Sequence, residues 1–258
     1  MNLELKNIKE ILDKLTKAIV DEKIIISKVG KSELMLLGLD NNFKIKKINQ
    51  PSISQQQLME LKSFNVFEWK ENEKYYESTM DINNYFHYII DQETEDMENM
   101  YLSNISNQHT ALKCQVGDIE LSGSGDYLLV INGKGNPEKR FKLDLDYVKN
   151  PSNFEFDNVY LGFEIKSTST INEFQGIAEL IAITRKSNGL HPILHISTNF
   201  NDNYIFSFWD IEGNVNWVKI ERKSAINLIQ SFVLKSKEFP KENFYNINGI
   251  NMYSKSLQ

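Results

Sequence analysis

The chain has 258 residues, of which 41% are apolar, 25% charged and 11% aromatic, and its formal net charge is −6. This composition excludes disordered, collagen-like and low-complexity proteins, and the length predicts one or two domains around a buried core. The single cysteine, Cys114, excludes an internal disulfide and a cysteine-based zinc site. No apolar run approaches the roughly 20 residues that span a bilayer, and the N-terminus lacks a signal-peptide pattern. We therefore expect an intracellular protein with no membrane partner.

The negative charge is unevenly distributed, which matters because nucleic-acid binders usually carry a positive excess. Residues 68–98 hold ten acidic residues and two lysines, whereas residues 219–258 hold seven basic and three acidic residues. The net charge alone would argue against a nucleic-acid substrate. Because it averages over regions that can face different partners, it does not exclude one.

The first 80 residues are predicted to form an N-terminal α+β extension or small domain. In chain order we expect an amphipathic helix over 3–20, a hairpin or meander over 23–48, a short helix over 51–61, and strands over 65–70 and 74–76.

Residues 81–258 are predicted to form the main α/β domain. Helical spacing covers 81–106, 171–187 and 224–237, and strand patterns cover 111–120, 127–132, 159–167, 193–198, 204–209 and 215–220. The strand–helix–strand step around 171–187 predicts a mixed sheet flanked by helices on both faces.

Two of these apolar strands carry charges. In the segment 160–167, Glu164 and Lys166 share one face of the predicted strand, and Phe163 and Ile165 face the other. Asp126 enters the strand 127–132. Two carboxylates can hold Mg²⁺, which prefers oxygen ligands, and a lysine beside them can stabilise a phosphate undergoing attack by water. This grouping suits metal-assisted phosphodiester hydrolysis.

Asp126, followed after 37 intervening residues (127–163) by Glu164-Ile165-Lys166 and then by a helix bearing Gln175, resembles the PD-(D/E)XK nuclease superfamily. The resemblance implies a restriction-endonuclease-like core of helix, three strands, helix and strand within about residues 85–210. Within the superfamily, the texture is similar to the nuclease domains of Crinkler-type effectors. The chain departs from the family pattern at Gly125, where many members have proline.

The resemblance also implies a role for each residue of the motif. Asp126 and Glu164 would bind Mg²⁺ or Mn²⁺, Lys166 would be the catalytic lysine, and Gln175 would contact the nucleophile or the phosphate. Many members add an acid from the preceding helix, for which Glu98 ranks first.

Each of these residues also has an alternative interpretation. Glu164 and Lys166 fit the solvated face of an edge strand, and Asp126 fits a turn. Gln175 fits the surface of its helix, and Glu179 fits a solvated or ion-paired position one turn later. His191 and His195 show no zinc-binding spacing and are interpreted as structural.

The predicted function is that of a metal-dependent endonuclease that hydrolyses DNA, with RNA less favoured. The candidate basic contacts to nucleic acid are Lys134, Lys139, Arg140, Lys186 and the C-terminal segment. The alternative is a non-catalytic module that binds nucleic acid or protein on a nuclease-like fold. A homodimer, and a protein partner for the N-terminal region, stay open.

Overall fold

The computed structural model describes residues 23–51, 64–69, 80–90, 100–106, 108–131, 156–167, 170–238 and 242–255. The helices are α2 (Lys31–Asp40), α5 (Met80–Ile90), α6 (Glu173–Lys186) and α7 (Arg222–Glu238), and the 3₁₀ helices are η1 (Ile26–Lys28) and η5 (Phe156–Asn158). The first six strands are β1 (Lys23–Ile25), β2 (Ile45–Lys47), β3 (Met100–Asn104), β4 (Cys114–Val116), β5 (Ile119–Ser122) and β6 (Tyr127–Ile131). The remaining strands are β7 (Val159–Ile165), β8 (Leu194–Thr198), β9 (Tyr204–Trp209), β10 (Val215–Ile220), β11 (Phe244–Ile247) and β12 (Ile250–Tyr253).

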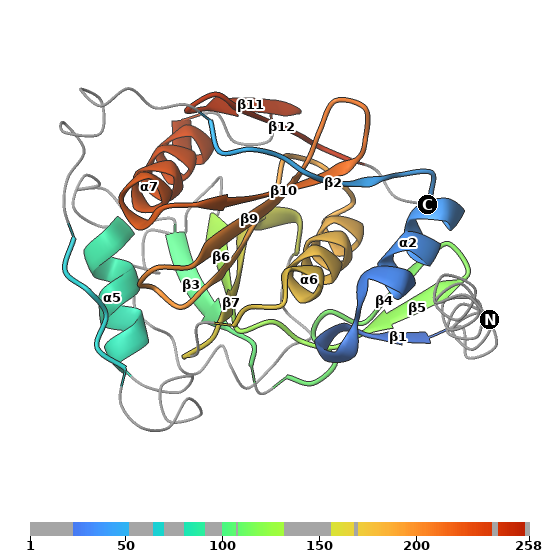
Figure 1. Cartoon of the computed structure of the whole chain (residues 1–258), viewed down its shortest axis with the longest axis horizontal. Coiled ribbons are helices and arrows are strands. Elements are labelled where there is room, and N and C mark those ends of the chain that lie inside the picture. The colour runs from blue at the N-terminus through green and yellow to red at the C-terminus, as the bar shows by residue number, and fades with distance from the viewer. Residues whose placement is uncertain are drawn as a thin grey trace, which may run out of the picture.

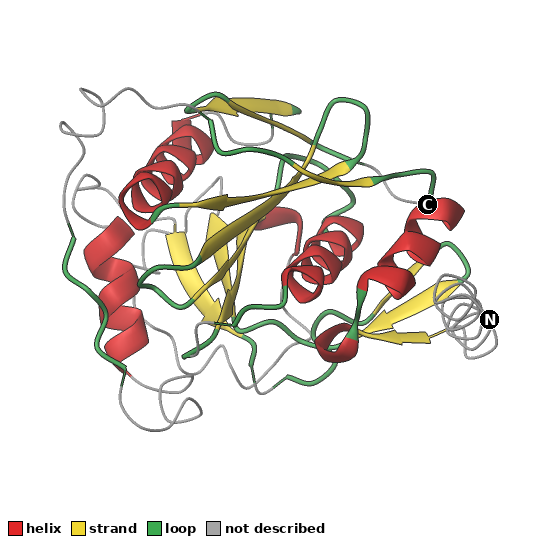
Figure 2. Ribbon diagram, in the orientation of Figure 1, coloured by secondary structure: helices red, strands yellow, loops and turns green. Residues whose placement is uncertain are grey.

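A seven-stranded mixed sheet forms the centre of the protein, in the order β2-β10-β9-β8-β7-β6-β3. The pairs β7–β8 and β2–β10 are parallel, and the other pairs are antiparallel. Helices cover both faces, with α5 and α7 on one side and α6 and α2 on the other (Figures 1 and 2). The predicted α/β class, with a mixed sheet between helical layers, is confirmed.

The alternation of side chains explains why the sheet is covered on both faces. Along β6, Tyr127 and Leu129 belong to the apolar cluster that contains α5 and α7, whereas Leu128 and Val130 belong to the cluster that contains α6 and α2. Because successive strand residues point to opposite faces, a strand that is apolar throughout must be buried on both sides.

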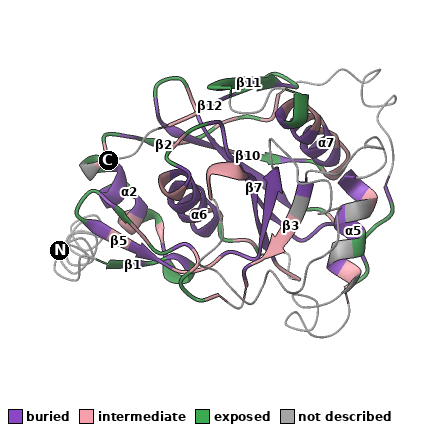
Figure 3. Cartoon of the chain, turned by 180° about the vertical axis from the view of Figure 1, so that it is seen from behind, coloured by how far each residue is buried: buried purple, intermediate pink, exposed green. Residues whose placement is uncertain are grey.

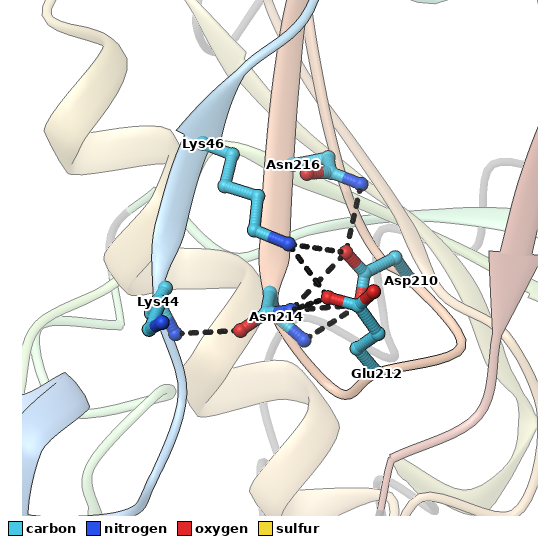
Figure 4. Close-up of polar contacts among 6 residues, drawn as sticks. All are labelled: Lys44, Lys46, Asp210, Glu212, Asn214 and Asn216. Atoms are coloured by element: carbon cyan, nitrogen blue, oxygen red, sulfur yellow. Dashed lines mark hydrogen bonds and ion pairs between the residues drawn. The ribbon is translucent and has the colours of Figure 1, made fainter.

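The described residues before 80 supply one strand to the central sheet and one to a smaller, three-stranded sheet. The strand β2 hydrogen-bonds to β10 at the edge of the central sheet, and β1 pairs with β5 in a three-stranded sheet of order β1-β5-β4. A hydrogen bond stabilises this edge: the backbone N–H of Lys44 donates to Asn214 Oδ1 at 3.0 Å. Figure 4 shows this contact beside the ammonium of Lys46, which pairs with Asp210 and Glu212.

Replacing Asn214 with alanine is expected to lower the free energy of unfolding by about 1–2 kcal/mol. The change removes the buried side-chain amide that joins Lys44, just before β2, to the turn between β9 and β10. Replacing Glu212 with glutamine, which keeps an oxygen for the Asn214 amide 2.9 Å away and whose position is 69% exposed, should change the free energy of unfolding by less than about 0.5 kcal/mol. Urea unfolding of both variants measures the difference. Equal losses would show that Asn214 does not anchor the edge.

Several predicted elements are confirmed and several are wrong. The helices over 171–187 and 224–237 and the strands over 127–132, 159–167, 193–198, 204–209 and 215–220 are present as α6, α7 and β6 to β10. The hairpin over 23–48 is wrong between residues 31 and 40, which form α2. The backbone N–H of Gly30 donates to the carboxylate of Glu33 at 3.1 Å, and this contact begins a helix rich in leucine and methionine.

Three further predictions need correction. The helix predicted over 81–106 ends at Ile90, and residues 100–104 form the edge strand β3. The strand predicted over 111–120 is instead a hairpin of β4 and β5, which turns at Gly117 with φ of +58°. Residues 64–69 form no strand. The helices predicted over 3–20 and 51–61, except residue 51, and the strand over 74–76 lie outside the described residues.

Within the described part of the chain, no helix combines the length and apolar character that crossing a membrane requires.

Candidate functional site

The carboxylate of Asp126 lies against the strand that carries Glu164. Asp126 directly precedes β6, and its Oδ2 accepts the backbone N–H of Ile165 at 2.6 Å. Its own N–H donates to the carbonyl of Phe163 at 3.1 Å, so it is fixed from two sides and only 6% exposed. Asp126 therefore lies in a bend before β6, as the turn interpretation has it, but its carboxylate is buried. Its carboxylate lies beside the peptide that joins Glu164 to Ile165.

Glu164 and Lys166 share a face near the end of β7, as predicted. Phe163 and Ile165 pack into the cluster of α5 and α7 on the opposite face. The ammonium of Lys166 lies 2.6 Å from Glu164 Oε1. Because β7 lies between β6 and β8 and Glu164 is 3% exposed, the alternative of a solvated edge strand is wrong.

Gln175 comes to the same place from the first turns of α6. The side chain of Asn172 caps this helix by accepting the N–H of Phe174. One turn in, the amide of Gln175 donates to Glu164 Oε1 at 2.6 Å and to Glu179 Oε1 at 3.0 Å. Gln175 is buried rather than on the helix surface (Figure 3 shows α6 and β7 as largely buried elements).

Glu179 on α6 and His195 on β8 extend this network of contacts beyond Gln175. Glu179 was expected to be solvated or ion-paired; it is 1% exposed, so the solvated position is wrong. Its Oε2 lies 2.8 Å from Nε2 of His195, which is fully buried on β8. A continuous chain of contacts therefore runs from Lys166 through Glu164, Gln175 and Glu179 to His195. His195 was expected to be structural. The sequence signal for the contact of Glu179 with Gln175 is their four-residue spacing, which places both side chains on one face of the helix.

Burial dominates the electrostatics of these groups. It raises the pKa of Glu164 well above its usual value, with a further increase from Glu179 and a partial offset from Lys166. Burial, and then the charge of Asp126, raise the pKa of Glu179 to about 8. Burial lowers the pKa of His195 to about 3. Both shifts favour the uncharged forms, so burial favours a hydrogen bond between neutral Glu179 and His195 over an ion pair.

No family model, curated protein or solved structure matches the chain. The function therefore has to be argued from the chemistry of the site.

The donor set fits a divalent cation that keeps much of its water shell. Among the residues that the structure describes, no three His, Cys, Asp or Glu side chains are grouped as a ready metal cage. Asp126 and Glu164 are nevertheless two buried carboxylates at one end of neighbouring strands, next to the carboxyl group of Glu179. Mg²⁺ is bound through one or two carboxylates and water, whereas a dry cage of protein ligands is unusual for it.

Some predicted residues cannot be placed at this site. Glu98 lies outside the described residues, as do Lys134, Lys139 and Arg140. Lys186 ends α6, eleven residues after Gln175, which corresponds to roughly 16 Å along the helix. Its ammonium lies 4.6 Å from the centre of the Phe156 ring.

Proposed function

We propose that the protein is a metal-dependent nuclease that hydrolyses phosphodiester bonds, with DNA favoured over RNA. Two contacts carry the proposal. The Lys166 ammonium contacts the Glu164 carboxylate, and the Asp126 carboxylate accepts the N–H of the next residue, Ile165. Two acids and a lysine thus lie at the adjoining ends of two neighbouring strands, a grouping suited to metal-assisted attack of water on a phosphodiester.

The order of elements supports the proposed restriction-endonuclease-like, PD-(D/E)XK arrangement. The elements α5, β3, β6, β7, α6 and β8 follow one another as helix, three strands, helix and strand, with β4 and β5 inserted after β3. In this arrangement the first core strand would be β3, and not the predicted segment 111–120, which lies in the separate small sheet.

The carboxylates of Asp126 and Glu164 would hold Mg²⁺ or Mn²⁺ at this site. Such an ion, when bound, lowers the pKa of a coordinated water and offsets the charge that develops on the phosphorus. The backbone N–H of Ile165 holds the Asp126 carboxylate in place, and the Gln175 amide holds that of Glu164.

Lys166 is the group that acts on the substrate. Its side chain is 32% exposed, whereas Glu164 beside it is buried, so it can reach a phosphate from the solvent side. Its ammonium would donate hydrogen bonds to a phosphate oxygen and orient the attacking water. Because its partner Glu164 fixes its position before substrate arrives, little reorganisation is needed in the reaction.

Incubation of the purified protein with plasmid DNA and with a folded RNA, each with Mg²⁺, Mn²⁺ or EDTA, tests the proposal. We expect cleavage with either metal, none with EDTA, and loss of cleavage in Asp126→Asn, whose amide is isosteric but cannot supply a carboxylate. If neither nucleic acid is cut with either metal, the enzyme proposal fails. Binding without cutting would favour the non-catalytic module.

A further inference from the structure

Three glycines, on the loop before β6, on β7 and on α6, leave room for the Glu179–His195 pair. A β-carbon on Gly125, just before Asp126, would lie 3.0 Å from Glu179 Oε2. A β-carbon on Gly162 of β7 would lie 2.5 Å from Ile183 Cδ1 and 2.8 Å from the His195 ring. One on Gly176 of α6 would overlap Ser197 Oγ and lie 3.0 Å from His195 Nδ1. Contacts this short require a neighbour to shift in a packed interior, so glycine at these positions leaves space for the pair and for Ile183 and Ser197 beside it.

The pair is also costly to bury. Within the described residues, His195 Nδ1 and Ser197 Oγ have no hydrogen-bond partner although both are buried. An apolar residue at 195 would avoid this cost, since a buried polar atom without a partner destabilises the fold. Features that break a packing rule without a local gain in stability are typical of functional sites.

Within the described residues, the hydrogen bonds of Glu179 lead to His195 on one side and to the proposed metal site on the other. Its Oε2 meets His195, and its Oε1 accepts the amide of Gln175. The same amide donates to Glu164 Oε1, which also contacts Lys166. The orientation of the Glu179 carboxyl therefore decides where the Gln175 amide can point, and that amide decides how the Glu164 carboxylate is turned.

We propose that His195 and Glu179 are positioning residues of the proposed nuclease site: His195 fixes the Glu179 carboxyl, which aims the Gln175 amide at Glu164. This inference rests on the proposed function. Gly125, at which the chain departs from the pattern of the family it resembles, belongs to the same arrangement, because a β-carbon there would press against the Glu179 carboxyl. The role is that of the outer groups that orient metal ligands, whose loss typically weakens metal affinity or activity by about 10–100-fold.

His195→Leu removes the contact, His195→Gln restores a polar group that can bond Glu179, and His191→Leu is the matched control. His191 is also a buried histidine, but it stacks on Tyr160 and bonds the carbonyl of Val159, away from the site. Calorimetry gives the Mg²⁺ affinity, and DNA cleavage gives kcat and KM. We expect His195→Leu to lower the Mg²⁺ affinity and kcat by at least about tenfold with KM for DNA unchanged, and His195→Gln to recover most of the loss.

Unchanged affinity and kcat in His195→Leu, or an equal loss in His191→Leu, would overturn the inference and leave the proposed function standing. If the wild-type protein neither binds Mg²⁺ nor cuts DNA, the proposed function fails and the inference fails with it. Should His195→Leu not fold, Gly125→Ala tests the same contact from the other side. Its added methyl group should displace the Glu179 carboxyl and lower the Mg²⁺ affinity in a folded protein, and unchanged affinity would contradict the positioning role.

Discussion

Replacing Lys166 with alanine is expected to reduce Mg²⁺-dependent DNA cleavage by at least about a hundredfold while the protein stays folded. Loss of one group that stabilises a transition state electrostatically typically costs about 10²–10³ in kcat. The fold should tolerate the change because the lysine directly follows β7 and is one-third exposed. Because Lys166 is not a metal ligand, Mg²⁺ binding by calorimetry should persist, which separates loss of chemistry from loss of the site.

Lys46→Ala is the matched control for this prediction. Lys46 is also a strand lysine, its side chain is 40% exposed, and its ammonium pairs with Glu212 at 2.8 Å, but it lies on β2 at the edge of the sheet. The Lys46→Ala variant should cut DNA at the wild-type rate. Full activity in Lys166→Ala, or an equal loss in Lys46→Ala, would contradict the role assigned to Lys166.

Replacing Glu179 with glutamine is expected to stabilise the protein at alkaline pH in the absence of divalent cations. The folded-state pKa of Glu179 is about 8 and the ordinary value is 4.5, so the folded protein resists ionisation that the unfolded chain accepts. The stability associated with this carboxyl is fully present below pH 4.5 and is lost as the pH rises through 8. At pH 8 the glutamine variant should therefore be more stable by roughly 2–4 kcal/mol, and near pH 5 by less than about 1 kcal/mol.

Urea unfolding of both proteins in EDTA between pH 5 and pH 8 measures this difference. Glu173→Gln, at the start of the same helix, is the control and should change the free energy of unfolding by less than about 0.5 kcal/mol at either pH. A wild-type stability that rises with pH relative to the glutamine variant would show that Glu179 ionises readily in the folded state.

The central strands could be predicted because each is an apolar run bounded by turn residues, and both faces of the sheet are covered. The segment 31–40 could not, since its leucines suit a buried strand as well as a helix, and the contact of Gly30 with Glu33 decides between them. The hairpin of β11 and β12 is absent from the elements expected above. Its Asn248-Gly249 turn, with φ of +50° and +78°, is nevertheless a strong hairpin signal.

The candidate site divides in the same way. Asp126, Glu164 and Lys166 could be chosen as candidates, and their proximity predicted, because a charge inside an apolar strand is unusual and is visible in the sequence. Glu179 could not, because its burial depends on what covers the helix. The helix α6 packs on β7, β8 and β9 on one side and on β4, η1 and α2 on the other, so residues 175–184 are all buried. A sequence read as a one-sided amphipathic helix places Glu179 in solvent.

The convergence of Asp126 and Glu164 on one metal ion is the central claim, and a crystal structure with Mn²⁺ located by its anomalous scattering tests it most directly. We predict one Mn²⁺ bonded to carboxylate oxygens of both residues, with water filling the other positions and Lys166 beside it. Mn²⁺ bound only elsewhere, or the two carboxylates directed to opposite faces of the sheet, would contradict the claim.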